Sequence, residues 1–320
     1  MSRCVRGSRF ISHFETRKAP ALTPACRLTV CVYGALPVAS AEDLGSVASD
    51  ENKNHHMKFT LRLFQQNPHH LVFASAILSS PGVCTALLTN ALDTVTPEIA
   101  ATTSHVQVWD NSVHLNGRSL AKREQFLMLV ELYKRRRQHY MEFLRRQQTA
   151  LVHSDIVFVD YDMLFVDDVR LPESGWSVAL TPVPELALRE HRFVNGGFVA
   201  IHRGQITQGL DFLSTTMHRW ELNMSRRDNG DQSSLLAAIG RNNLFASCPD
   251  AVAGCVLAPT TRVAMQVLLA DYTKLNNHVD TKETLDTLHA KGIRVLHFKG
   301  GRKTQMLALF QALMRHSNAC

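Results

Sequence analysis

Short apolar runs alternate with longer amphipathic stretches along most of this chain of 320 residues. Apolar, β-prone runs predict strands, and apolar positions spaced three and four residues apart predict helices. The expected strands cover residues 28–33, 71–74, 106–109, 156–159, 178–180, 198–201 and 294–296, and the expected helices cover 54–66, 119–148 and a segment that begins at Asp231. Strands that alternate with helices predict right-handed βαβ units. We therefore expect an α/β fold with a mostly parallel, Rossmann-like sheet flanked by helices in a single domain.

The start of the chain carries two competing interpretations. Residues 1–26 are basic and poor in acidic side chains, which predicts a disordered leader ahead of a domain at 27–315. The run at 28–33 is either the first strand of that domain or the apolar part of a long secretory signal, because Ala39-Ser40-Ala41 fits a cleavage pattern. We favour the strand, since the apolar region is short and weak for a signal.

Composition and charge narrow the class of protein. Hydrophobic residues make up 45% and charged residues 20%, which excludes disordered and fibrous classes. No apolar run is long enough to span a membrane, so we expect no transmembrane segment. The net charge of +7 is concentrated in residues 1–27 (+5) and 118–148 (+6). A nucleic-acid-binding domain usually spreads its basic residues over one folded face, so we interpret the second cluster as a solvated helix face. The alternative is that this helix holds an acidic partner.

Cysteine usage points to no particular chemistry. The seven cysteines show neither a C-x-x-C pair nor the spacing of zinc ligands. An odd and scattered set of this kind predicts free thiols, and a single bridge such as Cys248–Cys255 is the alternative.

Two acidic residues follow the most apolar of the predicted strands. Asp160 and Asp162 come directly after residues 156–159, a run expected of a parallel strand that is buried on both faces. Ligands of open α/β sheets bind at the carboxyl ends of strands, and alternate residues leaving a strand point the same way. The two carboxylates can therefore converge on one hard cation, although a D-x-D pattern also arises by chance.

A histidine and a glycine-rich segment follow the last predicted strand. His297 can complete a metal site that two carboxylates begin. Gly300 and Gly301 let backbone amides approach an anion, and Lys303 supplies a positive charge for phosphate. The alternative is a surface turn with basic flanks.

Two further polar patterns lie between these segments. Asn195-Gly196-Gly197 precedes the strand expected at 198–201, and an asparagine beside two glycines suits hydrogen bonding to a sugar held against the backbone. A β-turn is the alternative, because Asn-Gly is a strong turn dipeptide. Asp231 and Gln232 open an apolar helix, where Asp231 serves equally well as a simple N-cap.

The order of these motifs resembles that of the metal-dependent nucleotide-sugar transferases of the GT-A fold. The spacing of His297, Gly300 and Lys303 matches the H-x-x-G-x-x-K signature of the glycogenin and lipooligosaccharide galactosyltransferase group. The early chain, with its apolar run at 71–74, is similar to the plant-type nucleotide-diphospho-sugar transferases. The resemblance covers about residues 27–305, and it departs from the group where Pro-Trp is missing after the final lysine.

This resemblance implies a glycosyltransferase, a hexosyltransferase that moves a sugar from a UDP-sugar donor to an acceptor with retention of configuration. The implied roles are Asp160, Asp162 and His297 as ligands of Mn²⁺ or Mg²⁺, then Tyr161, Gly196, Gly300 and Lys303 with the two aspartates as nucleotide-sugar contacts, and Asn195, Asp231 and Gln232 as catalytic residues. A basic residue of the 118–148 helix would contact the diphosphate, and the candidates are Lys122, Arg145 and Arg146.

Other functions are compatible with the same residues. A haloacid-dehalogenase-type phosphatase would use Asp160 and Asp162, with the first as nucleophile, and a catalytically degenerate transferase fold would only bind ligands. The acceptor of a transferase would be a glycan, a protein or a polyanion. If a polyanionic acceptor is held by residues 135–137, its binding is expected to be sensitive to salt. The expected location is either the cytoplasm or the lumen of the secretory pathway and Golgi.

Overall fold

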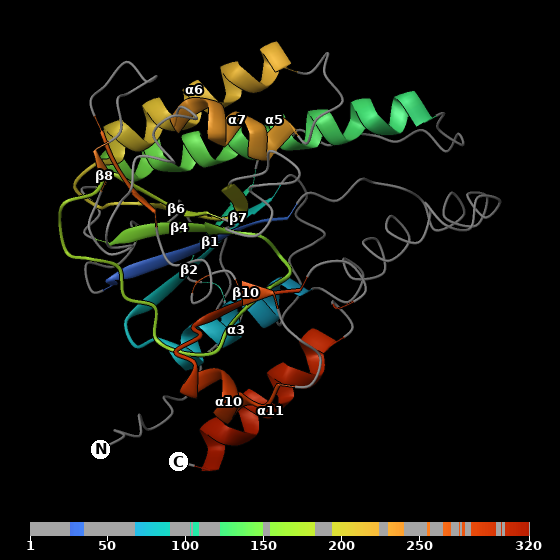
Figure 1. The fold of residues 1–320 in the computed structure, drawn as a ribbon, viewed down its shortest axis with the longest axis vertical. Coiled ribbons are helices and arrows are strands. Elements are labelled where there is room, and N and C mark those ends of the chain that lie inside the picture. Colours follow the sequence, from blue (N-terminus) through green and yellow to red (C-terminus); the bar gives the residue numbers. More distant parts are fainter. Residues whose placement is uncertain are drawn as a thin grey trace.

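Strands from most of the chain join in one large sheet in the computed structural model (Figure 1). The structure describes residues 26–34, 68–89, 103, 105–108, 122–149, 154–182, 194–223, 230–239, 255–256, 265–269, 275, 277–278, 283–298, 302 and 305–319. The strands of the large sheet are β1 (Leu28–Gly34), β2 (Val83–Thr89), β3 (His105–Val108), β4 (Asp155–Val159), β6 (Val178–Pro182), β7 (Val194–Ile201), β8 (Cys255–Val256) and β9 (Gln266–Leu269). They lie in the order β3-β2-β1-β4-β7-β6-β9-β8.

Most neighbours in this sheet run in the same direction. β1 pairs in parallel with both β2 and β4, β2 pairs in parallel with β3, and β6 pairs in parallel with β9. The antiparallel strands are β7, which lies between β4 and β6, and β8 at the edge. A smaller sheet has the order β10-β11-β5 and consists of β5 (Met163–Phe165), β10 (Asn277–His278) and β11 (Val295–His297). The predicted α/β fold with a mostly parallel sheet is confirmed.

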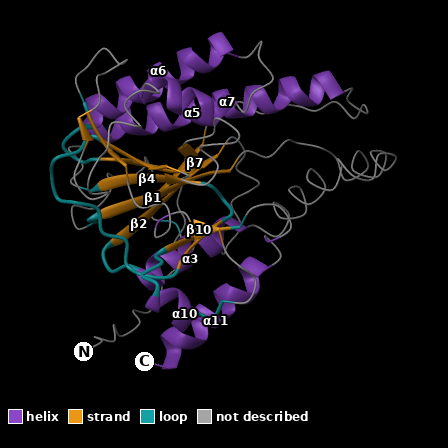
Figure 2. Ribbon diagram, viewed as in Figure 1, coloured by secondary structure: helices purple, strands orange, loops and turns teal. Residues whose placement is uncertain are grey.

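Helices cover both faces of the large sheet (Figure 2). One layer holds α5 (Lys122–Thr149), α6 (Ile206–Asn223) and α7 (Gly230–Ile239), and the other holds α3 (Pro68–Ser79), α10 (Leu285–Ala290) and α11 (Met306–Ala319). The small sheet lies on the side of α3 (Figure 1). None of the described helices is both long enough and apolar enough to cross a membrane.

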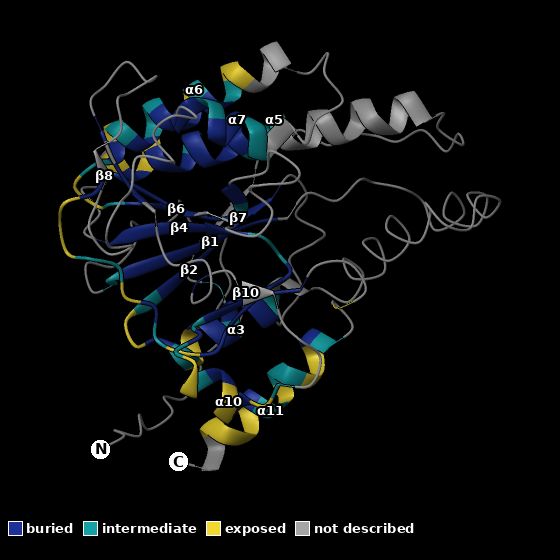
Figure 3. Ribbon diagram, viewed as in Figure 1, coloured by how far each residue is buried: buried dark blue, intermediate teal, exposed yellow. Residues whose placement is uncertain are grey.

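Side chains of the central strands alternate between two cores, one on each face of the sheet. On β1, Val30 and Val32 join the core that includes α3 and α11, whereas Cys31 and Tyr33 join the core under α5, α6 and α7. This is the two-residue period of a strand. Figure 3 shows these central strands as buried throughout. Burial on both faces explains why the sequence of β4 is continuously apolar rather than alternating.

One predicted strand is wrong, and the strands β2, β5, β8, β9 and β10 were not predicted. The apolar run at 71–74 lies inside helix α3, which begins at Pro68, a residue suited to the first position of a helix. A short apolar run does not distinguish a buried strand from the buried face of a helix, and this helix continues through Ala76. Among the strands that were not predicted, β2 pairs with β1, and its threonines, cysteine and alanine weaken its apolar signal.

The remaining predicted strands form, with one difference of placement. The strands expected at 28–33, 156–159, 178–180 and 198–201 correspond to β1, β4, β6 and β7, and β3 covers most of 106–109. The last expected strand forms as β11, in the small sheet rather than the large one. The long helix and the helix at Asp231 form as α5 and α7. Residues 1–25, the pattern at 39–41 and the helix expected at 54–66 lie outside the described residues.

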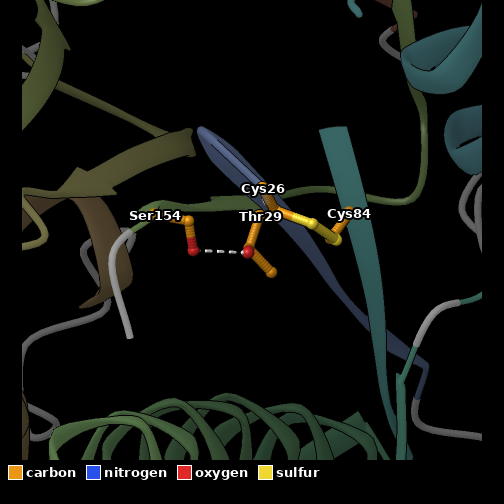
Figure 4. Close-up of a disulfide and its surroundings, with 4 residues drawn as sticks. All are labelled: Cys26, Thr29, Cys84 and Ser154. Atoms are coloured by element: carbon orange, nitrogen blue, oxygen red, sulfur yellow. Dashed lines mark hydrogen bonds between the residues drawn. A yellow bond between two sulfur atoms is a disulfide. The ribbon is translucent and has the colours of Figure 1, made fainter. Parts of the chain in front are cut away.

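Two cysteines form a bond that their spacing did not indicate. Cys26, just before β1, is disulfide-bonded to Cys84 of β2, with a Cα–Cα distance of 5.7 Å (Figure 4). Close to this pair, the hydroxyls of Thr29 and Ser154 hydrogen-bond at 2.8 Å. The expectation of free thiols is therefore wrong for Cys26 and Cys84, because the parallel pairing of β1 and β2 brings together residues that are distant in sequence. Cys31 is a buried free thiol.

Truncation of Leu144 tests the packing of α5 on the sheet. This side chain is fully buried, so Leu144→Ala is expected to lower the free energy of unfolding by about 2 to 5 kcal/mol. The matched control is Leu307→Ala on α11, where the side chain is 50% exposed and a loss below about 0.5 kcal/mol is expected. Urea unfolding of both variants measures the difference, and equal losses would contradict the described packing.

Candidate functional site

Asp160 and Asp162 follow β4 at its carboxyl end. The backbone N–H of Asp160 donates to the carbonyl of Gly197 on β7 at 3.0 Å, which ties the first aspartate to the neighbouring strand. The carbonyl of Asp162 accepts from the N–H of Phe298 at 2.8 Å, which ties the second aspartate to the end of β11. Both aspartates are therefore held by the backbone between the two sheets.

His297 reaches the same place from a distant part of the sequence. It is the last residue of β11, and the antiparallel pairing of β11 with β5 sets it opposite Met163, the residue after Asp162. Its Nε2 lies 3.3 Å from Asp162 Oδ1 and 3.9 Å from Asp160 Oδ2. One ligand atom from each of the three residues lies within 4.8 Å of the others, so the sequence-predicted trio is brought together.

The three side chains fit a divalent cation. Two carboxylates and one imidazole are ligands that suit Mn²⁺ and Mg²⁺, with the imidazole favouring Mn²⁺. Asp162 and His297 are buried, 6% and 3% exposed, whereas the carboxylate of Asp160 is 25% exposed. Asp160 is therefore the member of the trio that solvent reaches most.

Backbone rather than side chain approaches the trio from β7. A Cβ atom at Gly197 would lie 2.8 Å from His297 Cε1 and 3.1 Å from Asp160 Oδ2. No ordinary side chain fits there without a shift of the histidine ring, so glycine at this position belongs to the site. Sequence analysis named Gly197 only as part of a motif, because the residue it contacts comes from the end of the chain.

Asn195 and Gly196 lie within β7, not before it. The β-turn given as the alternative for this motif does not form. Asn195 and Gly196 are strand residues, and the pairing of β7 with β6 shifts register between Leu180 and Thr181. Asn195 is 1% exposed, and its Oδ1 accepts from the N–H of Gly197 at 2.8 Å. Its buried Nδ2 has no hydrogen-bond acceptor among the described residues.

Arg136 is a site residue that sequence analysis missed. Its Nη1 donates to Asp160 Oδ1 at 2.7 Å, and the side chain is only 12% exposed. Arg136 lies one helical turn before Tyr140 and two before Leu144, both buried on the face of α5 that packs on the sheet. An arginine at a position of the apolar stripe was the available signal, and it was hidden in a run of four basic residues.

The basic run is therefore not simply a solvated face. Arg137 is 4% exposed and Arg136 is engaged with Asp160, so two of the three residues at 135–137 expected to hold a polyanion are turned inward. Arg145 and Arg146 are more than half exposed and pair with Glu142. They lie about 13 to 15 Å along the helix from Arg136, so they are not the basic contact of the site. The side chain of Lys122 lies outside the described residues.

The structure describes only some of the other residues that the sequence predicted for the site. Tyr161 is partly buried and packs against the core that includes α3, and Gln232 is half-buried in the first turn of α7. Asp231 also lies in that turn, but its side chain is outside the described residues, as are Gly300 and Lys303. Their proposed roles stay predictions.

The trio lies beside the point where the connections of the sheet change direction. β2 and β3 extend from one side of β1 and β4 from the other, with Val32 of β1 opposite Val159 of β4. In open α/β sheets, ligands bind outside the carboxyl ends of strands at such a switch point. Next to it, the ring of Tyr33, one residue before the end of β1, lies 5.0 Å from that of His139 on α5, edge to face.

Comparisons with known proteins give likenesses among solved structures. No family model matches the chain, and no curated protein matches it. Among solved structures, it is similar to the glycosyltransferase GlyE of Streptococcus pneumoniae TIGR4, with a TM-score of 0.44 and 10% sequence identity. The match covers 91% of this chain and 60% of that protein's chain.

His139 makes stability depend on pH. Burial, and then the nearby charge of Arg135, lowers the pKa of His139 from 6.5 to about 4. Between these values the unfolded chain binds more protons at this imidazole than the folded protein does. The stabilising contribution of the neutral histidine is therefore fully present above pH 6.5 and decreases as the pH falls toward 4, by about 3 kcal/mol. Urea unfolding across this range should show a shallower decrease for His139→Gln than for the wild type. Parallel curves would contradict the assignment.

Gly197→Ala tests the close approach of β7 to the histidine. The added methyl group should displace the ring of His297 and weaken the binding of Mn²⁺, used as a probe, by about tenfold or more. Gly204→Ala is the matched control, because its Cβ would lie 3.4 Å from the ring of His202, an ordinary contact away from the site. Isothermal titration calorimetry compares the two variants, and equal Mn²⁺ affinities would contradict this geometry.

Proposed function

We propose that this chain is a metal-dependent glycosyltransferase of the GT-A fold, which transfers a sugar from a UDP-sugar donor with retention, and that its domain covers residues 27–315. The observation that carries the proposal is the convergence of Asp160, Asp162 and His297 beside the switch point of the sheet. The resemblance of the sequence to this family rests on motifs that contain the same residues. The acceptor is a glycan or a protein.

The trio would hold Mn²⁺ or Mg²⁺. Such a cation neutralises the negative charge that gathers on a departing diphosphate. The residues of the chain would then bind and orient the donor around that position. Asn195 offers a buried amide Nδ2 from β7, suited to a hydroxyl of the donor sugar, and the partly buried Gly196 lies next to it.

Other contacts follow from the placement of the elements. The strand β1 ends at Tyr33 and Gly34 beside the trio, so we assign the nucleoside to that end of the sheet. Asp231 and Gln232 open α7, which packs against β7, the strand of Asn195, and we assign them to the reacting side of the sugar. Tyr161 would contact the nucleotide. The backbone amide of Gly300 and the ammonium group of Lys303 would bind its diphosphate.

Donor hydrolysis is the direct test of this function. Wild-type protein, incubated with a panel of UDP-sugars and Mn²⁺, should slowly release UDP from one donor, and EDTA should abolish the release. Asp162→Asn removes a ligand charge at nearly constant shape and should lower the rate by about 100-fold or more. Asp286→Asn is the matched control, because Asp286 is an exposed acid in the first turn of α10 and should leave the rate unchanged.

Three experimental outcomes would contradict the proposed function or support one of its alternatives. Absence of hydrolysis together with absence of any metal-dependent thermal shift by the donors would contradict a UDP-sugar site. Metal-dependent donor binding without turnover, tested with a range of acceptors, would support the binding-only alternative. Hydrolysis of p-nitrophenyl phosphate that is lost in Asp160→Asn would support the phosphatase instead.

A further inference from the structure

The two carboxylate oxygens of Asp160 face different partners. Oδ1 accepts a hydrogen bond from Arg136 Nη1 at 2.7 Å, and Oδ2 lies on the side of His297 Nε2, at 3.9 Å. The guanidinium group is therefore hydrogen-bonded to Asp160, one of the residues proposed as a cation ligand. It is 12% exposed, so solvent screens its charge less than that of a surface arginine.

The charges of this cluster do not match a bare divalent cation. With His297 neutral, as a metal-binding imidazole must be, the two carboxylates and Arg136 carry a net charge of −1. A divalent cation converts that charge to +1. Like charges close together in a partly buried site repel strongly, whereas an anion bound at the same place would remove the excess.

We propose that Arg136 weakens the binding of the cation alone and thereby makes tight cation binding depend on a diphosphate anion. The inference rests on the proposed metal site and adds a regulation of it, in which cation and nucleotide bind as a pair. Because coupling between two ligands is reciprocal, the same arginine also makes nucleotide affinity depend on the cation. A residue that only positioned Asp160 would have the opposite effect, since its removal would weaken cation binding.

Position on α5 supports a role at the site rather than on the surface. The stripe of α5 that packs on the sheet contains Tyr140, Phe143 and Leu144, all buried, and Arg136 continues that stripe toward the carboxyl end of β4. An aliphatic residue would fill that position for packing alone. A buried charge that is merely structural is easily replaced by an apolar side chain, so its placement on a ligand carboxylate indicates function.

The test measures binding, not turnover. Mn²⁺ affinity is measured from the electron paramagnetic resonance signal of the free ion, without nucleotide, for the wild type, Arg136→Gln and Arg136→Lys. Arg136→Gln should bind Mn²⁺ about tenfold more tightly than the wild type, and Arg136→Lys, which keeps the charge, should resemble the wild type. Arg146→Gln is the control for loss of a basic residue from the same helix, and its Mn²⁺ affinity should be unchanged because Arg146 pairs with Glu142 instead.

The coupling is measured with UDP as the probe. Its affinity is determined by calorimetry in EDTA and in saturating Mn²⁺, and the ratio of the two dissociation constants is the coupling factor. Arg136→Gln should reduce that factor about tenfold, because in the wild type the bound anion relieves the repulsion between Arg136 and the cation, and the variant has no such repulsion to relieve. Arg136→Lys and Arg146→Gln should keep the factor of the wild type.

The outcomes separate this inference from the proposed function. If Arg136→Gln binds Mn²⁺ as the wild type does, or more weakly, the inference is overturned while the metal site stands. If neither protein binds Mn²⁺ with or without UDP, the metal site fails and the inference with it. Should thermal melting show that Arg136→Gln is unfolded, Arg136→Met replaces it, because methionine preserves the apolar stem of the arginine.

Discussion

The pairing of β5 with β11 is the interaction on which the candidate site depends. β5 follows Asp162 directly, and β11 ends at His297, so a single antiparallel register places the histidine beside the second aspartate. The hydrogen bond from Phe298 N–H to Asp162 carbonyl closes this junction. A shift of one residue in this register would turn His297 to the opposite face and separate it from the carboxylates.

The packing of α5 is the second constraint on the site. The ring of Tyr140 stacks on that of Phe158 in β4, with centroids 4.0 Å apart, and Phe143 meets the same ring edge to face. These contacts join the helix to the strand that ends at Asp160. They therefore fix the position along β4 at which Arg136 reaches the carboxylate of Asp160. The aromatic packing thus supports the ion pair that adds a positive charge to the site.

Some elements were predictable from local pattern, and others were not. The continuous apolar run of β4 and the aspartates after it were correctly placed, because burial on both faces leaves a clear local signal. The run at 71–74 was wrongly predicted to be a strand, since the buried face of α3 has the same composition as a short strand. No spacing rule indicated the Cys26–Cys84 disulfide, and the run of four basic residues hid the position of Arg136 on the apolar stripe of α5.

By itself, the sequence determined the chemistry available at the site: two carboxylates after a buried strand, a histidine after another, and an asparagine among glycines. It also determined the fold class, because alternating strands and helices restrict the topology. Only the tertiary structure decided that Arg136 and Gly197 belong with them, that Asn195 lies within a strand, and that β11 joins the small sheet. These contacts link residues that are far apart in the chain, and sequence patterns report only the local preferences of each segment.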